Sequence, residues 1–438
     1  MKNACAIILV LLAAPVFAQH PLGEDRPRIS GPLTVRQAVD QALKGNLEIQ
    51  MSQAEAAAAG QESRSARAMT RPRVSANTYL TGGSMPNIFS TTPGVTPSNS
   101  LVVPGKAYVD QNLTLMLPLY TGGRLENQVK AAAGRETAAN AGIGTARADA
   151  ALMVRDAYYR ALLATEMEKV AQARLDAGRA LLDTTRVLFE AGKGLQASVA
   201  RAEAEIADAQ RMQTSARNDR EKMLLDLRRA MGVRLDSDIT LADSLSYTSL
   251  DRTLDAALDE ANRVRPELLA ARARLESAKA QTGAARGAFQ PQVYGTAMGD
   301  VFAPDDMNRH TGGTVGVTIS IPLFDAGQRR AELGQMTSMQ RRAEVDVKNL
   351  ELRVATEVRQ AWLDVDTAGQ NYRTAQVAVQ SAQSAYDVVA LRVQNQKSIL
   401  VEQLDAQAAL VQSRTNLAQA LYDHSIAVAR LQRAIGRP

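Results

Sequence analysis

The feature that most constrains this chain is an internal repeat. The segment LPLYTGG, residues 117–123, recurs as IPLFDAG, residues 321–327, at a separation of 204 positions. The same separation relates AMG at 230–232 to AIG at 434–436. A pattern that recurs over more than 100 residues without net insertion predicts two copies of one folding unit.

Upstream of that segment the separation grows to 219 positions, as between Pro72 and Pro291. The difference of 15 lies in a stretch rich in Pro, Gly, Ser and Asn, residues 81–105, which is longer than its counterpart at 303–313. Such insertions are tolerated at exposed loop tips. We divide the chain into a signal peptide at 1–18, a first repeat at 19–232, a linker at 233–251 and a second repeat at 252–438.

Each copy contains a stretch in which apolar residues alternate with small or polar ones. These positions are Leu113, Leu115, Leu117 and Leu119 in the first copy, and Val315, Val317, Ile319 and Ile321 in the second. A period of two predicts β-strands with one apolar face. Weaker strands are expected at 73–81 and 292–302, which completes a hairpin in each copy.

The two longest stretches between the strands are free of proline and contain abundant alanine, which favours helices. Residues Arg124–Glu190 and Gln328–Gln394 predict two helices of 67 residues, each about 100 Å long. Shorter helices of 37 residues are expected at Thr34–Thr70, Leu195–Met231, Thr253–Phe289 and Ile399–Ile435. Strand and helix meet at Pro118, Gly123, Pro322 and Gly327.

The N-terminus has the pattern of a secretory signal. Lys2 precedes an apolar run at 4–14, and Val16 and Ala18 have the spacing of a cleavage site, so the mature chain is expected to begin at Gln19. This run is too short for a permanent transmembrane helix, and no later stretch approaches the necessary length. Passage through a membrane would therefore have to use the strands.

Four strands cannot close a barrel, and an open edge in lipid would leave backbone groups without hydrogen bonds. Three chains would supply twelve strands. The order of helix, hairpin, long helix, tip and return helix resembles the TolC-like outer-membrane efflux family over nearly the whole mature chain. The motifs that carry this resemblance are the two strand–helix junctions, AMG and AIG, FEAGKGLQASVARA at 189–202 and VQNQKSILVEQLDA at 393–406.

The resemblance implies an α+β membrane protein: a homotrimeric 12-stranded β-barrel, four strands per chain, in outer-membrane lipid, continued by a long periplasmic α-helical barrel. It implies a passive exit duct for efflux or type I secretion, opened by a periplasmic adaptor (a membrane fusion protein) and an inner-membrane pump. The adaptor is expected at the two helical tips, although these residues could merely reverse the chain. They are Gly192, Gly194, Leu195 and Ser198, and Lys397, Ser398 and Ile399.

Glu402 and Asp405 are three residues apart and so share a helix face just beyond the second tip. The resemblance implies that they line the pore constriction, where six carboxylates of a trimer would favour cations. The alternative is a solvated helix face. Val393 and Ser398 replace a tyrosine and an arginine of some members, so we expect the closed state to be held differently.

The sequence gives little support to other classes of protein. His20, His310 and His424 have no metal-ligand spacing, so we expect no metal, no cofactor and no enzymatic activity. The net charge of +5 is spread along the chain, which does not favour nucleic-acid binding. A periplasmic coiled-coil adaptor or structural protein remains the alternative, although it would lack the duplicated β-hairpins.

Overall fold

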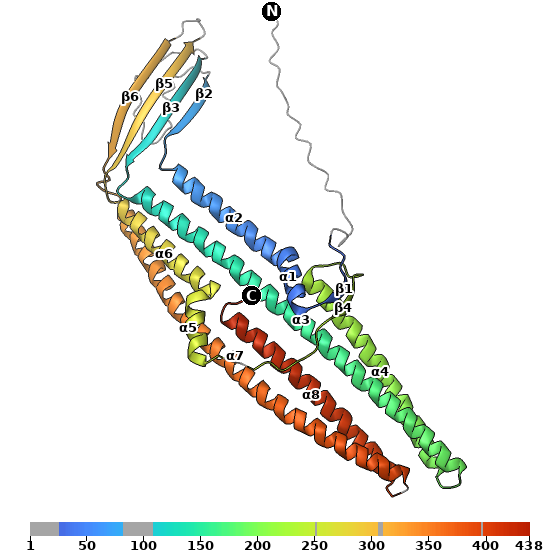
Figure 1. Ribbon diagram of the computed structural model, residues 1–438. Coiled ribbons are helices and arrows are strands. Elements are labelled where there is room, and N and C mark those ends of the chain that lie inside the picture. Colours follow the sequence, from blue (N-terminus) through green and yellow to red (C-terminus); the bar gives the residue numbers. More distant parts are fainter. Residues whose placement is uncertain (1–25, 82–107, 250–251, 305–309, 396) are drawn as a thin grey trace, which may run out of the picture.

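The computed structural model describes residues 26–81, 108–249, 252–304, 310–395 and 397–438. The predicted signal peptide, most of the long loop at 81–105 and Gln396 lie outside these residues. The molecule is elongated, with a β-sheet at one end, helices along its length and two helical tips at the other end (Figure 1). No helix within the described ranges combines the length and apolarity needed to cross a membrane.

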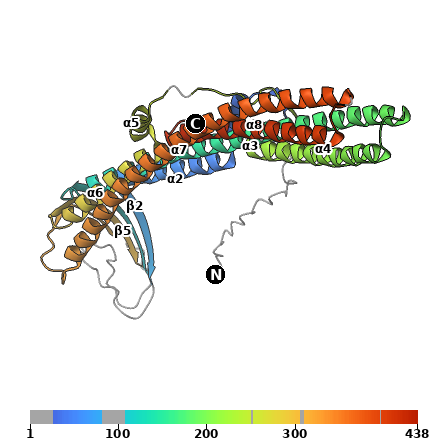
Figure 2. The same ribbon diagram turned by 90° about the horizontal axis from the view of Figure 1, so that it is seen from below.

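Two helical hairpins form most of the length. The long helices are α3 (Arg124–Glu190) and α7 (Gln328–Gln394), each of 67 residues as predicted. Each turns at its tip into a shorter helix, α4 (Gln196–Met231) or α8 (Leu400–Ala434). Both hairpins run to the same end of the molecule (Figures 1 and 2).

The predicted continuous helices at Thr34–Thr70 and Thr253–Phe289 were wrong, because each is broken once. They form α1 (Val35–Gly45), α2 (Leu47–Ala68), α5 (Leu254–Val264) and α6 (Pro266–Gly287). Asn46 breaks the first, since its side chain accepts hydrogen bonds from the amides of Glu48 and Ile49 and caps α2. Pro266 begins α6 and holds the preceding Arg265 in an extended conformation.

The four predicted strands form one antiparallel sheet in the order β2-β3-β5-β6. They are β2 (Arg73–Thr81), β3 (Tyr108–Tyr120), β5 (Gln292–Pro304) and β6 (His310–Ser320). The two hairpins join through β3 and β5, while β2 and β6 are the edges. All of the predicted alternating apolar side chains except Leu117 are exposed, and that of Val315 is 87% exposed.

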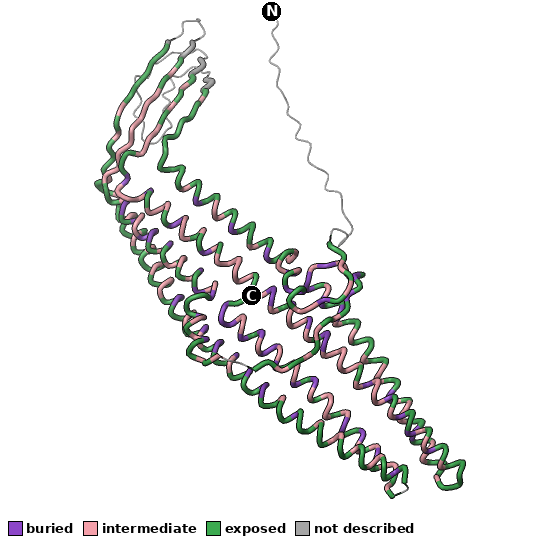
Figure 3. The backbone as a smooth tube through the Cα atoms, viewed as in Figure 1, coloured by how far each residue is buried: buried purple, intermediate pink, exposed green. Residues whose placement is uncertain are grey.

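A small parallel sheet was not predicted. Strand β1 (Ser30–Leu33) pairs with β4 (Asp238–Leu241), which lies in the segment assigned to the linker. Tyr158 of α3 is buried beneath this sheet and donates a hydrogen bond from its hydroxyl to the carbonyl of Leu33 at 2.7 Å. Buried residues gather around this region and along the helix contacts, whereas the tips and sheet are mainly exposed (Figure 3).

Candidate functional site

The strand–helix junctions use left-handed backbone at equivalent positions. Gly123 and Gly327 directly precede α3 and α7 with φ of 81° and 90°. At the second junction, Asp325 accepts hydrogen bonds from the amides of Gly327 at 3.0 Å and Arg329 at 3.1 Å. The Arg329 side chain also donates a hydrogen bond to the Asp325 carboxylate. This side-chain bond, followed by the amide bonds, lowers the pKa of the Asp325 carboxyl below its usual value.

The two junction prolines differ in position. Pro118 lies within β3, where the pairing with β5 shifts before Tyr120. Pro322 follows β6, and its carbonyl accepts a hydrogen bond from the Arg329 guanidinium at 3.4 Å. Both prolines therefore mark the end of regular pairing, which is where a residue without an N–H is compatible with a sheet.

The first tip reverses the chain between α3 and α4. Gly192 has a φ of 69°, and a Cβ on Gly194 would come within 2.9 Å of the Phe189 amide nitrogen. These constraints explain both glycines structurally. The turn leaves Leu195 72% exposed beside the partly exposed Phe189, and Ser198 lies in the first turn of α4. The tip therefore presents apolar side chains to solvent.

The second tip is closed by side chains and backbone together. The amide of Lys397 donates to the carbonyl of Arg392 at 2.8 Å, and the Arg392 guanidinium donates back to the Lys397 carbonyl at 3.3 Å. Ser398 donates from its hydroxyl to the carboxylate of Glu402. Ile399 is exposed and precedes α8. This tip, like the first, combines a tight reversal with an exposed apolar residue.

Glu402 and Asp405 lie in the first two turns of α8 and are exposed. The structure joins Glu402 to Ser398, a contact that was not predicted. The opposite face of the same turns is buried and carries Gln403 and Gln407. One side of α8 thus presents carboxylates to solvent, while the other packs against the bundle.

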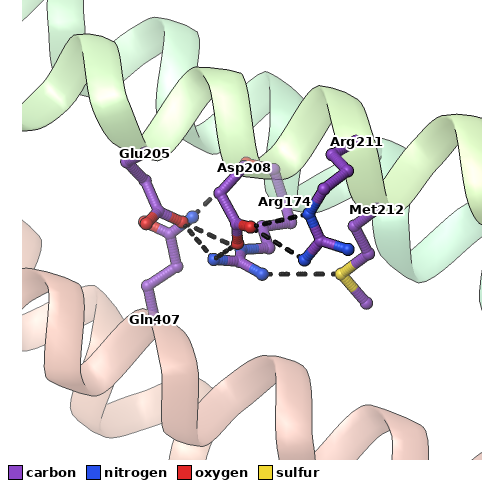
Figure 4. Close-up of polar contacts among 6 residues, drawn as sticks. All are labelled: Arg174, Glu205, Asp208, Arg211, Met212 and Gln407. Carbon is purple, nitrogen blue, oxygen red and sulfur yellow. Dashed lines mark hydrogen bonds and ion pairs between the residues drawn. The ribbon is translucent and has the colours of Figure 1, made fainter.

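A polar cluster on α3 and α4, next to Gln407 of α8, was not predicted (Figure 4). The Arg174 guanidinium of α3 forms ion pairs with Glu205 at 2.8 Å and Asp208 at 2.9 Å, both on α4. Hydrogen bonds from Arg211 and the charge of Arg174 lower the pKa of Asp208. The spacing of Glu205 and Asp208 indicates a shared helix face, but nothing in the sequence pairs them with Arg174.

The segment between the repeats also makes specific contacts. The Asp243 carboxylate accepts a hydrogen bond from the Val35 amide at 2.7 Å, and the Asp243 amide donates to the Tyr158 hydroxyl at 3.3 Å. The Tyr247 ring lies 4.8 Å from that of Tyr372 and 4.6 Å from that of His424. The predicted linker therefore fastens α1 and α3 to α7 and α8.

His424 lies on α8 and is only 2% exposed. It lines a cavity of about 460 Å³ together with Tyr159, Asp243 and Ser246. Burial lowers the pKa of its imidazole below the usual value. Among the described residues, no three His, Cys, Asp or Glu side chains are grouped as metal ligands would be.

Comparison with known proteins identifies the arrangement of these elements. The family described as "Outer membrane efflux protein" matches residues 38–233 and 257–437. The outer membrane efflux protein BepC of Brucella suis is 26% identical over 98% of this chain and 90% of its own length. The alkaline protease secretion protein AprF of Pseudomonas aeruginosa is 25% identical over 64% of this chain, a match that spans 60% of that relative.

Solved structures show the same fold. The outer-membrane channel OprN superposes with a TM-score of 0.79 at 22% sequence identity, covering 94% of each chain. At this identity the likeness concerns the fold, including the sheet at one end and the paired helical tips at the other.

Proposed function

This chain belongs to the outer membrane efflux protein family and is an outer-membrane channel protein, and from that premise we propose that it is the passive exit duct of a tripartite assembly. In this proposal a periplasmic adaptor and an inner-membrane pump deliver cargo to the helical end. Relatives are named for efflux and for protease secretion, so the proposal covers both kinds of cargo. The family assignment replaces the alternative of a periplasmic coiled-coil adaptor.

The observation that carries this proposal is the open four-stranded sheet, in which apolar side chains are exposed. Within the described chain β2 and β6 each pair on one side alone. Val315, Val317 and Ile319 expose an apolar face to the surroundings, and sheet edges in lipid must be paired. We therefore propose that β6 of one copy pairs with β2 of the next, so that three copies close a 12-stranded barrel.

The exposed face of α7 supports assembly along the helices as well. Five large apolar residues are spaced by 7, 11, 14 and 11 positions, which keeps them on one narrow helix face. They are Val345, Leu352, Leu363, Val377 and Val388. Such a stripe on a helix at the border of the protomer fits contact with the neighbouring copy, which would continue the barrel as a helical tube.

The tips and the first turns of α8 are assigned functions within this tube. We propose that exposed apolar residues at the tips, Leu195 and Ile399, contact the adaptor. Glu402 and Asp405 lie close to the second tip and are exposed on one helix face. Three copies would bring six carboxylates together, where cations would be favoured and the titrations coupled.

The assembly is tested with protein extracted from outer membranes in detergent. We expect a trimer that resists dissociation until heated, a mature N-terminus at Gln19 by mass spectrometry, and conductance in planar bilayers. A water-soluble monomer without conductance would reject the proposal.

The constriction is tested separately in those bilayers. Replacing both Glu402 and Asp405 by alanine should weaken cation selectivity and block by Mg²⁺, because the divalent ion loses its carboxylate partners. Wild-type selectivity and block in the double variant would remove these residues from the constriction.

A further inference from the structure

Gln407 has an amide group that is buried and only half satisfied. It lies on α8 two residues beyond Asp405, and its side chain is 3% exposed. Its Nε2 donates to the backbone carbonyl of Arg174 on α3 at 3.3 Å (Figure 4). Because a carbonyl can only accept, this bond fixes the orientation of the amide. The other amide atom, Oε1, is buried without a hydrogen-bond partner.

A polar residue in a helix–helix seam lowers stability but can fix the register of the helices. Gln403, Gln407 and Leu410 form the buried stripe at the start of α8. Apolar side chains in place of the two glutamines would be buried there at a smaller cost in stability. At the position equivalent to Gln407, 204 residues earlier, Glu203 is exposed and pairs with Arg186 at 2.9 Å. The buried amide therefore belongs to α8 and has no counterpart on α4.

The acceptor of this hydrogen bond lies on a braced segment. The side chain of Arg174 is held by Glu205 and Asp208 of α4, and its carbonyl receives Gln407 of α8. One residue thus connects three helices. Because α3 is fixed to α4 at this level, a bond to Arg174 positions α8 relative to the whole first hairpin.

We propose that Gln407 is a positioning residue that sets the register of α8 against α3 and so places Glu402 and Asp405 in the constriction. The inference rests on the proposed function of those two carboxylates. A slip by one helical turn would move them about 5.4 Å along the tube.

The test compares Gln407→Met with the wild-type trimer in planar bilayers. Methionine keeps the length and packing of the side chain but cannot donate to Arg174. We expect the Mg²⁺ concentration for half block to rise about two- to tenfold, the range that corresponds to one net hydrogen bond. Gln412→Met is the matched control, since Gln412 is exposed on the same helix and donates a hydrogen bond to Asn416 within α8. Block of the Gln412→Met channel by Mg²⁺ should equal that of the wild type.

A second comparison separates positioning from general structure. In a chain that already carries Glu402→Ala and Asp405→Ala, Gln407→Met should cause no further change, because the groups through which it acts are gone. Equal shifts in both backgrounds, or no shift in the wild-type background, would overturn the inference. Heat-dependent migration confirms assembly of each variant, and Gln407→Ala provides the same comparison if the methionine variant does not assemble.

The outcomes also distinguish this inference from the proposal beneath it. If the two alanines leave Mg²⁺ block unchanged, the constriction itself is wrong and the inference falls with it. If they abolish block while Gln407→Met has no effect, the constriction stands and the positioning role of Gln407 is rejected.

Discussion

At the scale of single residues, equivalent positions of the two halves face different constraints. Gly122 has a φ of 61°, and an added Cβ would come within 2.3 Å of the Gln290 Cβ. At the corresponding position the chain has Ala326, which keeps a φ of 53°. The first junction therefore requires glycine, because its φ is positive and a Cβ would clash with Gln290. The second junction has room for the alanine side chain, which is held there with backbone strain.

We expect Gly122→Ala to destabilise the protein more than Gly327→Ala. The φ of Gly327 is 90°, but an added Cβ there would meet no atom within 4 Å, so that variant experiences only backbone strain of about 1–3 kcal/mol. Thermal dissociation of the two variants in the same detergent measures the difference. Equal losses would show that the contact between Gly122 and Gln290 is easily relieved.

The buried imidazole of His424 predicts a dependence of stability on pH. Burial holds its pKa below the value in the unfolded chain, about 6.5. Its contribution to stability is therefore complete above that value and decreases as the pH falls toward the pKa of the folded state. We expect thermal stability to decrease on acidification below pH about 6.5, and His424→Gln to reduce that decrease. An unchanged pH profile in the variant would contradict this assignment.

At the scale of elements, short-range capping decides where the helices end. The predicted continuous helix at Thr34–Thr70 overlooked Asn46, whose side chain caps α2. Similarly, Pro266 starts α6 because its missing N–H is not needed in the first turn. Both signals are visible in the sequence, each within a stretch that was expected to form one continuous helix.

We expect Asn46→Ala to loosen the start of α2, with a loss of about 0.5–2 kcal/mol, because the amides of Glu48 and Ile49 lose their acceptor. Hydrogen exchange of the first turn measures the local effect. Asn46→Asp serves as the control, since its carboxylate can accept the same bonds. Equal protection in the alanine variant and the wild type would show that the break does not depend on the cap.

At the scale of the whole molecule, all proposed functions depend on the assembly of copies. A single chain brings the two tips to one end and the four-stranded sheet to the other (Figure 1). This polarity suits a duct whose one end is in lipid and whose other end meets soluble partners. The segment of Asp243 and Tyr247 ties the two halves of each chain together midway between these ends.

We expect a cysteine at Ser198 to cross-link to a cognate periplasmic adaptor, since this residue lies in the first turn of α4 close to the exposed Leu195. A cysteine at the exposed Asn140, far along α3 from the tip, is the control and should react poorly. Cross-linking in cells that express both proteins provides the measurement. Efficient reaction at the control site alone would reject docking at the tip.

The sequence by itself determined the features that depend on local pattern. Alternating leucines and valines specified the strands, and glycines at 122–123 and 192 bounded α3 at Arg124 and Glu190. The same motifs, in the same order, indicated the family that the comparison confirmed. These predictions succeeded because periodicity, chain reversal and helix initiation involve residues within a few positions of one another.

Only the tertiary structure decided the contacts between distant segments. Ser30–Leu33 pairs with Asp238–Leu241, His424 is buried against Tyr247, and Gln407 meets Arg174. His424, Gln407 and Arg174 are polar residues whose local sequence pattern also fits a solvated surface. Their environment depends on which helix faces pack together, and that packing is set by the combined burial of many side chains rather than by any local sequence.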